Sequence, residues 1–127
     1  TTTGSGSDGT DDLGDPAVRW KNIYLSGGVV DTTTTVSYAS SISLSYTNGA
    51  IQTVTLTGDV TFTDGLADGE AIVLMLNAGA SHNVTWTVVD YWVSSGGNAA
   101  PTLTAKDTIV LWKIGSDVYA AYAGSFA

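Results

Sequence analysis

The chain has few side chains whose types and spacing permit catalysis, and the first set is centred on its single histidine. His82 follows Ser81 and precedes Asn83, in a segment that we predict to be a turn. A Ser–His–Asp site needs a nucleophile and a carboxylate on either side of the imidazole, but side chains adjacent on extended backbone point apart. We therefore predict that His82 is an exposed loop residue without a catalytic role.

A second set consists of carboxylates that are close in sequence, namely Asp64, Asp68 and Glu70. Glycoside hydrolysis needs two carboxyl groups across a sugar, one of them with a raised pKa, and a metal ion needs several converging oxygens. Gly65 and Gly69 stand beside these residues, which is typical of turns in which acidic side chains bond to the backbone. The pattern predicts a solubilising turn rather than a hydrolase or metal site.

A third acidic group precedes the rest of the chain, in a lead rich in Gly, Ser, Thr and Asp. Asp8, Asp11, Asp12 and Asp15 could offer oxygens to calcium, but the EF-hand spacing and its terminal Glu are missing. Cysteine is absent, which removes disulfides, thiol catalysis and Cys-type zinc sites together. We therefore predict a solvated acidic linker, no catalytic residue, no cofactor and no metal, and thus not an enzyme.

The aromatic side chains offer binding chemistry instead, because the chain has four Trp and six Tyr. Tyr91 and Trp92 are adjacent at a predicted strand end, before a loop of small residues at 94–101. Aromatic rings flanked by small polar residues can stack on sugar rings. Tyr91 and Trp92 are therefore candidate ligand contacts, with packing inside the subunit or against a neighbour as the alternative.

Composition narrows the range of partners. The net charge is −8 with only four basic residues, so the clustered Lys and Arg that neutralise phosphates are missing. This excludes nucleic-acid binding and a basic patch for anionic lipids. The longest apolar run, residues 71–76, is too short to cross a bilayer, so we predict no membrane insertion. The chain begins with Thr1 rather than Met, which leaves open that it is a fragment.

The elements that position these residues are predicted to be strands. Apolar residues alternate with Ser or Thr at 42–47, and Gln52, Val54 and Leu56 alternate with Thr at 52–57. Asn48-Gly49 between these runs is the strongest short hairpin signal. Residues 71–76 predict a central, fully covered strand, and residues 108–114 and 118–123 predict a hairpin with a three-residue turn at 115–117. We predict an all-β domain at 41–127, an antiparallel β-sandwich or jelly-roll-like fold, behind an extended linker and assembly segment at 1–40.

The assembly segment carries large apolar side chains on a short polar tether. Trp20, Ile23, Tyr24 and Leu25 lie within six positions, in a stretch at 19–25 that could form one short strand with an apolar residue on each face. Such groups need a surface to bury against, which a neighbouring copy of the chain could supply. We therefore predict these four residues to lie in a subunit interface.

The same stretch resembles a motif common in the tail fibres of tailed bacteriophages. The resembling residues are Leu13-Gly14, followed by Arg19-Trp20-Lys21-Asn22-Ile23-Tyr24-Leu25-Ser26-Gly27. Segments 57–62, 66–70, 111–115 and 122–124 resemble a fibre-tip or virion-surface domain of marine phages. The resemblance carries no catalytic signature and implies where the protein is found rather than what it touches.

The resemblance implies a structural component on the outer surface of a virion, a tail-fibre tip segment with threefold symmetry. Its partners would then be further copies of itself, other virion proteins and a host surface glycan or protein. Two other hypotheses remain, a capsid decoration or head-fibre protein and a free carbohydrate-binding β-sandwich module.

Overall fold

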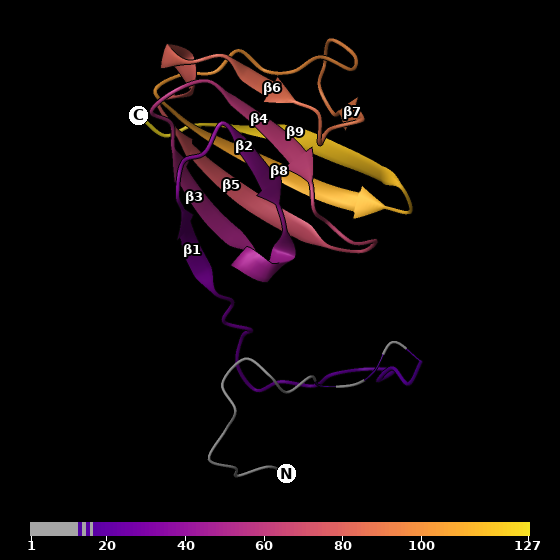
Figure 1. The fold of residues 1–127 in the computed structure, drawn as a ribbon. Helices are drawn as coiled ribbons and strands as arrows, with labels where there is room; N and C mark the ends of the chain where they lie inside the picture. The colour runs from indigo at the N-terminus through magenta and orange to yellow at the C-terminus, as the bar shows by residue number, and fades with distance from the viewer. Residues whose placement is uncertain (1–12, 14, 16) are drawn as a thin grey trace.

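The computed structural model describes residue 13, residue 15 and residues 17–127. Of the predicted linker at the start of the chain, Asp8, Asp11 and Asp12 lie outside the described residues. The described residues form a β-rich body and an arm that leaves it on the N-terminal side (Figure 1).

The regular elements of the body are strands, with almost no helix, which confirms the prediction of a β-rich fold. Two single-turn 3-10 helices, η1 (Tyr46–Asn48) and η2 (Gly79–Ser81), interrupt them. The strands within the described residues are β1 (Thr33–Val36), β2 (Ser41–Leu44), β3 (Ile51–Thr55), β4 (Val60–Asp64), β5 (Ala71–Asn77), β6 (Val84–Trp86), β7 (Tyr91–Trp92), β8 (Lys106–Ile114) and β9 (Asp117–Ser125).

The strands form two sheets, and the first six alternate between them. The large sheet has the order β1-β3-β5-β8-β9-β7, and the small sheet has the order β2-β4-β6. Within the large sheet β1, β3 and β5 are parallel, and all of the small sheet is parallel. Each turn of the chain therefore adds one strand to each sheet, as the ribbon shows (Figure 1).

This topology shows that the prediction of an antiparallel sandwich or jelly roll is wrong for these six strands. Asn48-Gly49 does not close a hairpin, because β2 and β3 belong to different sheets and the chain crosses between them at η1. Gly49 does have the positive φ that the sequence signal requires, at 85°. A Cβ atom there would stand 2.0 Å from the backbone oxygen of Thr32, so the crossover itself requires glycine.

The second half of the large sheet follows the sequence prediction more closely. Strand β5 is central, parallel to β3 on one side and antiparallel to β8 on the other. Strands β8 and β9 form the predicted hairpin, but Ile114 pairs with Asp117, so the turn has two residues rather than three. Only the inner face of β5 is fully covered, because Val73 and Met75 on its outer face are half-buried.

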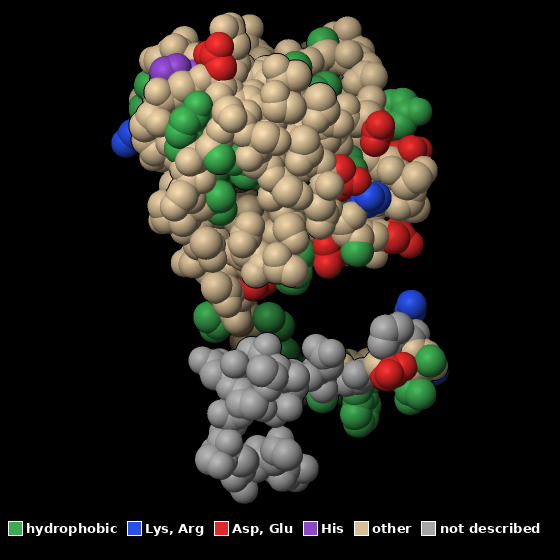
Figure 2. All heavy atoms as spheres, viewed as in Figure 1, with side chains coloured by type: hydrophobic (Ala, Val, Ile, Leu, Met, Phe, Trp, Pro, Cys, Tyr) green, Lys and Arg blue, Asp and Glu red, His purple; other side chains and the backbone are tan. Residues whose placement is uncertain are grey.

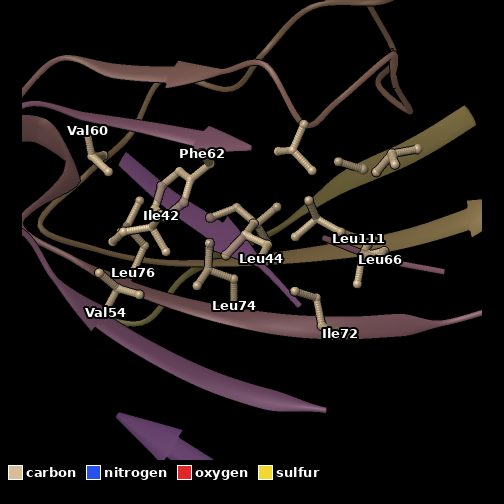
Figure 3. Close-up of a cluster of buried hydrophobic side chains, with 14 of the residues drawn as sticks. Ile42, Leu44, Val54, Val60, Phe62, Leu66, Ile72, Leu74, Leu76 and Leu111 are labelled. Carbon is tan, nitrogen blue, oxygen red and sulfur yellow. The ribbon is translucent and has the colours of Figure 1, made fainter. Parts of the chain in front are cut away.

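The hydrophobic core lies between the two sheets (Figure 3). The small sheet and its connections contribute Ile42, Leu44, Val60, Phe62 and Leu66, and the large sheet contributes Val54, Ile72, Leu74, Leu76, Ile109, Leu111, Val118 and Ala120. Two polar side chains are buried with them, Gln52 and Asp107. The Gln52 amide nitrogen donates to the backbone oxygens of Ser45 and Gly49, at 2.8 and 2.9 Å, and so fixes the crossover.

The loops at one end of the body are joined by Asp59, whose carboxylate accepts two hydrogen bonds from Asn83. The Asn83 backbone N–H donates to Oδ1 at 2.9 Å and its Nδ2 donates to Oδ2 at 3.1 Å. These bonds, the backbone one foremost, hold the pKa of Asp59 below its ordinary value of 3.8.

A pH dependence of stability follows from the lowered pKa of Asp59. A carboxyl group whose pKa is lower in the folded state stabilises the fold above its unfolded-state pKa, and the contribution is lost as the pH falls through the folded-state pKa. We expect Asp59→Ala to lower the thermal unfolding midpoint at pH 7, and the gap from wild type to narrow below about pH 4. Circular-dichroism melts of both proteins from pH 7 to pH 2 would check this, and a constant gap would contradict it.

Candidate functional site

The predicted interface residues lie on an arm, defined here as residues 17–30, that lies clear of the body (Figure 2). Seven large apolar side chains on it are between 57% and 97% exposed: Val18, Trp20, Ile23, Tyr24, Leu25, Val29 and Val30. The short strand predicted for residues 19–25 is wrong, because these residues have no strand assignment. Extended backbone needs a neighbouring strand to form a ladder, and β1, the strand that follows the arm in the chain, pairs with β3 alone within the described residues.

The arm has little internal structure of its own. Asp15 and Val18 exchange backbone hydrogen bonds of 3.1 and 3.0 Å, and Asn22 Nδ2 donates to the Tyr24 hydroxyl at 3.2 Å. At the base of the arm the Tyr46 hydroxyl donates to Asp31 Oδ2 at 2.8 Å, which lowers the pKa of Asp31. The exit point of the arm is thus tied to η1, whereas its apolar residues are left without a covering surface.

The two aromatic residues predicted to contact a ligand lie on opposite faces of β7. Trp92 points toward the core, where it meets Trp86 edge-on at 5.4 Å, and Trp86 stacks on Phe62 at 4.9 Å. Tyr91 points to the outer face of the large sheet and is 47% exposed. Adjacent residues of a strand alternate between faces, so Tyr91 and Trp92 do not form one platform.

Tyr91 belongs to a row of aromatic rings that crosses the outer face of the large sheet. It pairs with Tyr119 on β9, and Tyr119 pairs with Trp112 on β8. The Tyr91 and Tyr119 rings stack at 5.3 Å, and the Tyr119 and Trp112 rings stack at 6.0 Å. We call these three residues the aromatic row. The sequence does not reveal it, because the pairing of β7 with β9 has no local signal.

The outer faces of the two sheets differ in chemistry. On the small sheet the outward side chains are Ser or Thr: Ser41, Ser43, Thr61, Thr63 and Thr85. On the large sheet, the outward side chains over β5, β8, β9 and β7 are mostly apolar. The aromatic row and its apolar neighbours are defined here as the apolar face: Ala71, Val73, Met75, Val110, Trp112, Tyr119, Ala121 and Tyr91.

A cavity of about 510 Å³ lies under the loop after β7. Its lining combines aromatic, small and hydroxyl side chains: Trp92, Val93, Ser94, Ser95, Ala99, Ala100, Pro101, Thr102 and Tyr122. The loop is held by Asn98, whose Oδ1 accepts from the Trp92 backbone N–H at 2.6 Å and whose Nδ2 donates to the Asp90 backbone oxygen at 3.1 Å.

The buried Asp107 fixes the wall of this cavity. Its Oδ1 accepts from the Tyr122 hydroxyl at 2.9 Å and from Thr104 Oγ1 at 2.7 Å, and its Oδ2 accepts from the Thr104 backbone N–H at 2.8 Å. Burial, followed by the bond to Asp107, raises the pKa of Tyr122. The Tyr122 hydroxyl therefore donates its hydrogen bond to Asp107, and the phenol ring lines the cavity.

The residues considered for catalysis lie at opposite ends of β5, the three acids before it and His82 after it. His82 is half-buried at the end of η2 rather than exposed as predicted. Asp64 pairs with Lys113 and accepts from the Leu66 N–H, Asp68 accepts from the Gly115 N–H, and Glu70 accepts from the Ala67 N–H. Each carboxylate thus bonds to a turn. The described residues contain no group of three His, Asp or Glu side chains arranged to hold a metal ion.

Two findings complete the description of the site. In the part of the chain that the structure describes, no helix is both long and apolar enough to cross a membrane. The chain matches no protein-family model, no curated protein and no solved structure. The function is therefore inferred from the arm, the apolar face and the loop cavity.

Proposed function

We propose that the chain is a structural component on the outside of a tailed-phage virion, a segment of a trimeric tail fibre that assembles through its arm. The observation that carries this proposal is the exposure of seven large apolar side chains on residues 17–30. Isolated exposed apolar residues are ordinary, but a contiguous group on a tether is typical of an interaction site. Trp20 and Tyr24 are the anchors, because large aromatic residues dominate interface energetics.

Burial of the arm's apolar side chains favours an associated state over an arm free in solvent. Burying a large aliphatic or aromatic side chain contributes about 1.5–3 kcal/mol, so several such groups offset much of the entropy lost on association. The resemblance of residues 13–27 to a tail-fibre motif supports a trimer and a location in the virion. In this proposal the two facing sheets form a β-sandwich-like knob, whose loop at residues 90–101 faces a host surface glycan or protein.

The mass in solution tests this proposal. We expect light scattering at micromolar concentration to give three times the chain mass of 13.0 kDa. A variant in which Trp20, Ile23 and Tyr24 are all replaced by Ser should be monomeric. Its circular-dichroism melt should match that of wild type diluted until it is monomeric, since these side chains are exposed and do not belong to the core. A wild type that is folded and monomeric at that concentration would refute assembly through the arm.

The position in the virion is a separate matter, because a capsid decoration or head-fibre protein would also assemble through an exposed arm. Immunogold labelling of particles, seen by electron microscopy, separates the two positions. Label on the tail fibres supports the tail-fibre proposal, whereas label on the head supports the decoration hypothesis.

The loop cavity favours a second candidate, a free carbohydrate-binding module. It places the Trp92 and Tyr122 rings beside the Ser94, Ser95 and Thr102 hydroxyls, a combination of apolar area and polar edges that suits a sugar. A monomer with measurable affinity for neutral oligosaccharides, lost in Ser95→Trp because the indole fills the cavity, would support this candidate over the fibre.

A further inference from the structure

The apolar face lacks the chemistry of a solvated sheet surface. A sheet covered on one side alternates apolar residues inward with polar residues outward, and the small sheet does so with five Ser and Thr residues. Over the middle of β5, β8, β9 and β7 the outward positions are instead Val, Met, Ala, Tyr and Trp, and polar residues such as Asn77, Lys106, Thr108 and Asp117 lie toward the strand ends. Both faces belong to one domain and meet the same solvent in a single copy, so the difference indicates that the large-sheet face is covered in the assembled protein.

The geometry of the aromatic row indicates what kind of surface covers it. The three rings stack on one another at 5.3 and 6.0 Å, so their faces are partly used within the row. The outer edge of the aromatic row therefore forms a ridge. Beside it lie the smaller side chains of Val73, Val110 and Ala121, which pair with one another across β5, β8 and β9. A ridge next to a shallow apolar strip accommodates a segment of extended chain with large side chains.

Charge distinguishes the possible occupants. Residues 31–127 carry eight acidic and two basic residues, a formal charge of −6. Residues 17–30 carry Arg19 and Lys21 and no acid, a formal charge of +2, with Asp15 two positions before them. Three acids gather at one end of the apolar face, where β5 begins and the β8–β9 hairpin turns. Asp117 lies in that hairpin, Asp68 accepts from the Gly115 N–H at 2.7 Å, and the Glu70 backbone oxygen accepts from the Lys113 N–H. An apolar segment that carries positive charge suits this surface.

We propose that the apolar face is the docking surface for the arm of a second copy of this chain. This rests on the proposed function and deepens it by naming the surface that receives the arm. Trp20 and Tyr24, which share one face of an extended segment, cover the strip formed by Val73, Val110 and Ala121 and the flank of the aromatic row. Lys21, beside Trp20, then lies at the edge toward Asp117, and each docked arm removes apolar side chains of both the arm and the apolar face from water.

The docking is between copies because a single copy leaves both surfaces uncovered. The arm leaves the body at Asp31, beside β1, and its apolar side chains are exposed in the folded chain (Figures 1 and 2). Head-to-tail docking of this kind gives a ring where the rotation between copies closes, and in a trimeric ring every copy gives one arm and receives one.

Cysteine cross-linking tests the docking directly, since the chain has no cysteine of its own. Ser26→Cys marks the arm without changing an apolar side chain, and Ala121→Cys marks the apolar face. Mixing the two full-length variants, carrying tags of different size, under mild oxidation should give a disulfide-linked heterodimer. Thr85→Cys, on the outer face of the small sheet, is the matched control and should give at most a tenth of that yield.

The other cross-linking outcomes overturn the proposal. Equal yields for the Ala121→Cys and Thr85→Cys partners would mean that the arm has no preferred surface. Cross-links only between two Ala121→Cys copies would mean that the apolar faces pack on each other. A single chain that carries both Ser26→Cys and Ala121→Cys is the last test. If it forms an intramolecular disulfide while the mixture of single variants gives no heterodimer, the arm packs on its own body.

A charged substitution on the apolar face tests the docking surface separately from assembly through the arm. Ala121→Lys should weaken association by about tenfold or more, because an ammonium group would be buried without a partner, whereas Thr61→Lys on the small sheet should leave it unchanged. Melts of the two variants, each diluted until it is monomeric, should be alike, since both positions face outward. If Ala121→Lys keeps the wild-type mass while the triple arm variant is monomeric, the docking surface is refuted and assembly through the arm stands. If the wild type is monomeric, both are refuted.

Discussion

Replacing Phe62 with alanine is expected to lower the free energy of unfolding by about 3–5 kcal/mol, the range for removing a fully buried aromatic side chain. Phe62 is 0% exposed on the middle strand of the small sheet and stacks on Trp86 at 4.9 Å. Its ring lies in the layer between the sheets, among the core residues labelled in Figure 3. The loss would combine the transfer free energy of the ring with a cavity that the neighbouring strands cannot close.

The small sheet makes this position more sensitive than a comparable one in the large sheet. It has only three strands, of four, five and three residues, so few other contacts hold it against the core. Urea unfolding followed by tryptophan fluorescence and circular dichroism measures the change. Thr61→Ala, one residue away but on the outer face, is the control and should shift stability by no more than about 0.5 kcal/mol. A similar small shift for Phe62→Ala would contradict the core described above.

The positions of the strands could be predicted from the sequence, but their partners could not. Alternation of apolar with Ser or Thr residues indicates which side chains face a core, and it identifies the strands β2 and β3. A strand buries the same face whether its neighbour is parallel or antiparallel. The interpretation of Asn48-Gly49 as a hairpin turn therefore assumed that strands adjacent in sequence pair. Gly49 has the expected positive φ, but it leads the chain from one sheet to the other.

The candidate sites also differ in how far the sequence alone could predict them. The apolar residues of the arm could be identified locally, because a short polar tether gives them nothing to pack against, and they are exposed in the structure. The split between Tyr91 and Trp92 could have been read from strand alternation, although the prediction treated them as a pair. The aromatic row could not have been read at all, since it depends on β9 lying between β7 and β8. That surface is created by long-range strand pairing, which a single sequence does not reveal.

Replacing Trp20 with alanine is expected to weaken self-association by roughly 2 kcal/mol or more at each site where an arm docks. The indole is 66% exposed in the single chain, so its truncation removes little that stabilises the folded copy. In a trimer three arms dock, and roughly 2 kcal/mol at each would amount to roughly 6 kcal/mol, or about four orders of magnitude in the overall association constant. Analytical ultracentrifugation over a concentration series measures this shift, and the thermal melt of the dilute, monomeric protein should not change.

Asn22→Ala distinguishes loss of the indole from a general effect on the arm. Asn22 is exposed two residues further along the arm, and its side chain donates to the Tyr24 hydroxyl, so its truncation should change association by less than about 0.5 kcal/mol per site. Equal losses for the two variants would mean that the arm acts through its backbone, as an added strand would, rather than through apolar anchors. An unchanged association constant for Trp20→Ala would remove Trp20 from the interface and leave Ile23, Tyr24 and Leu25 as the remaining apolar anchors to test.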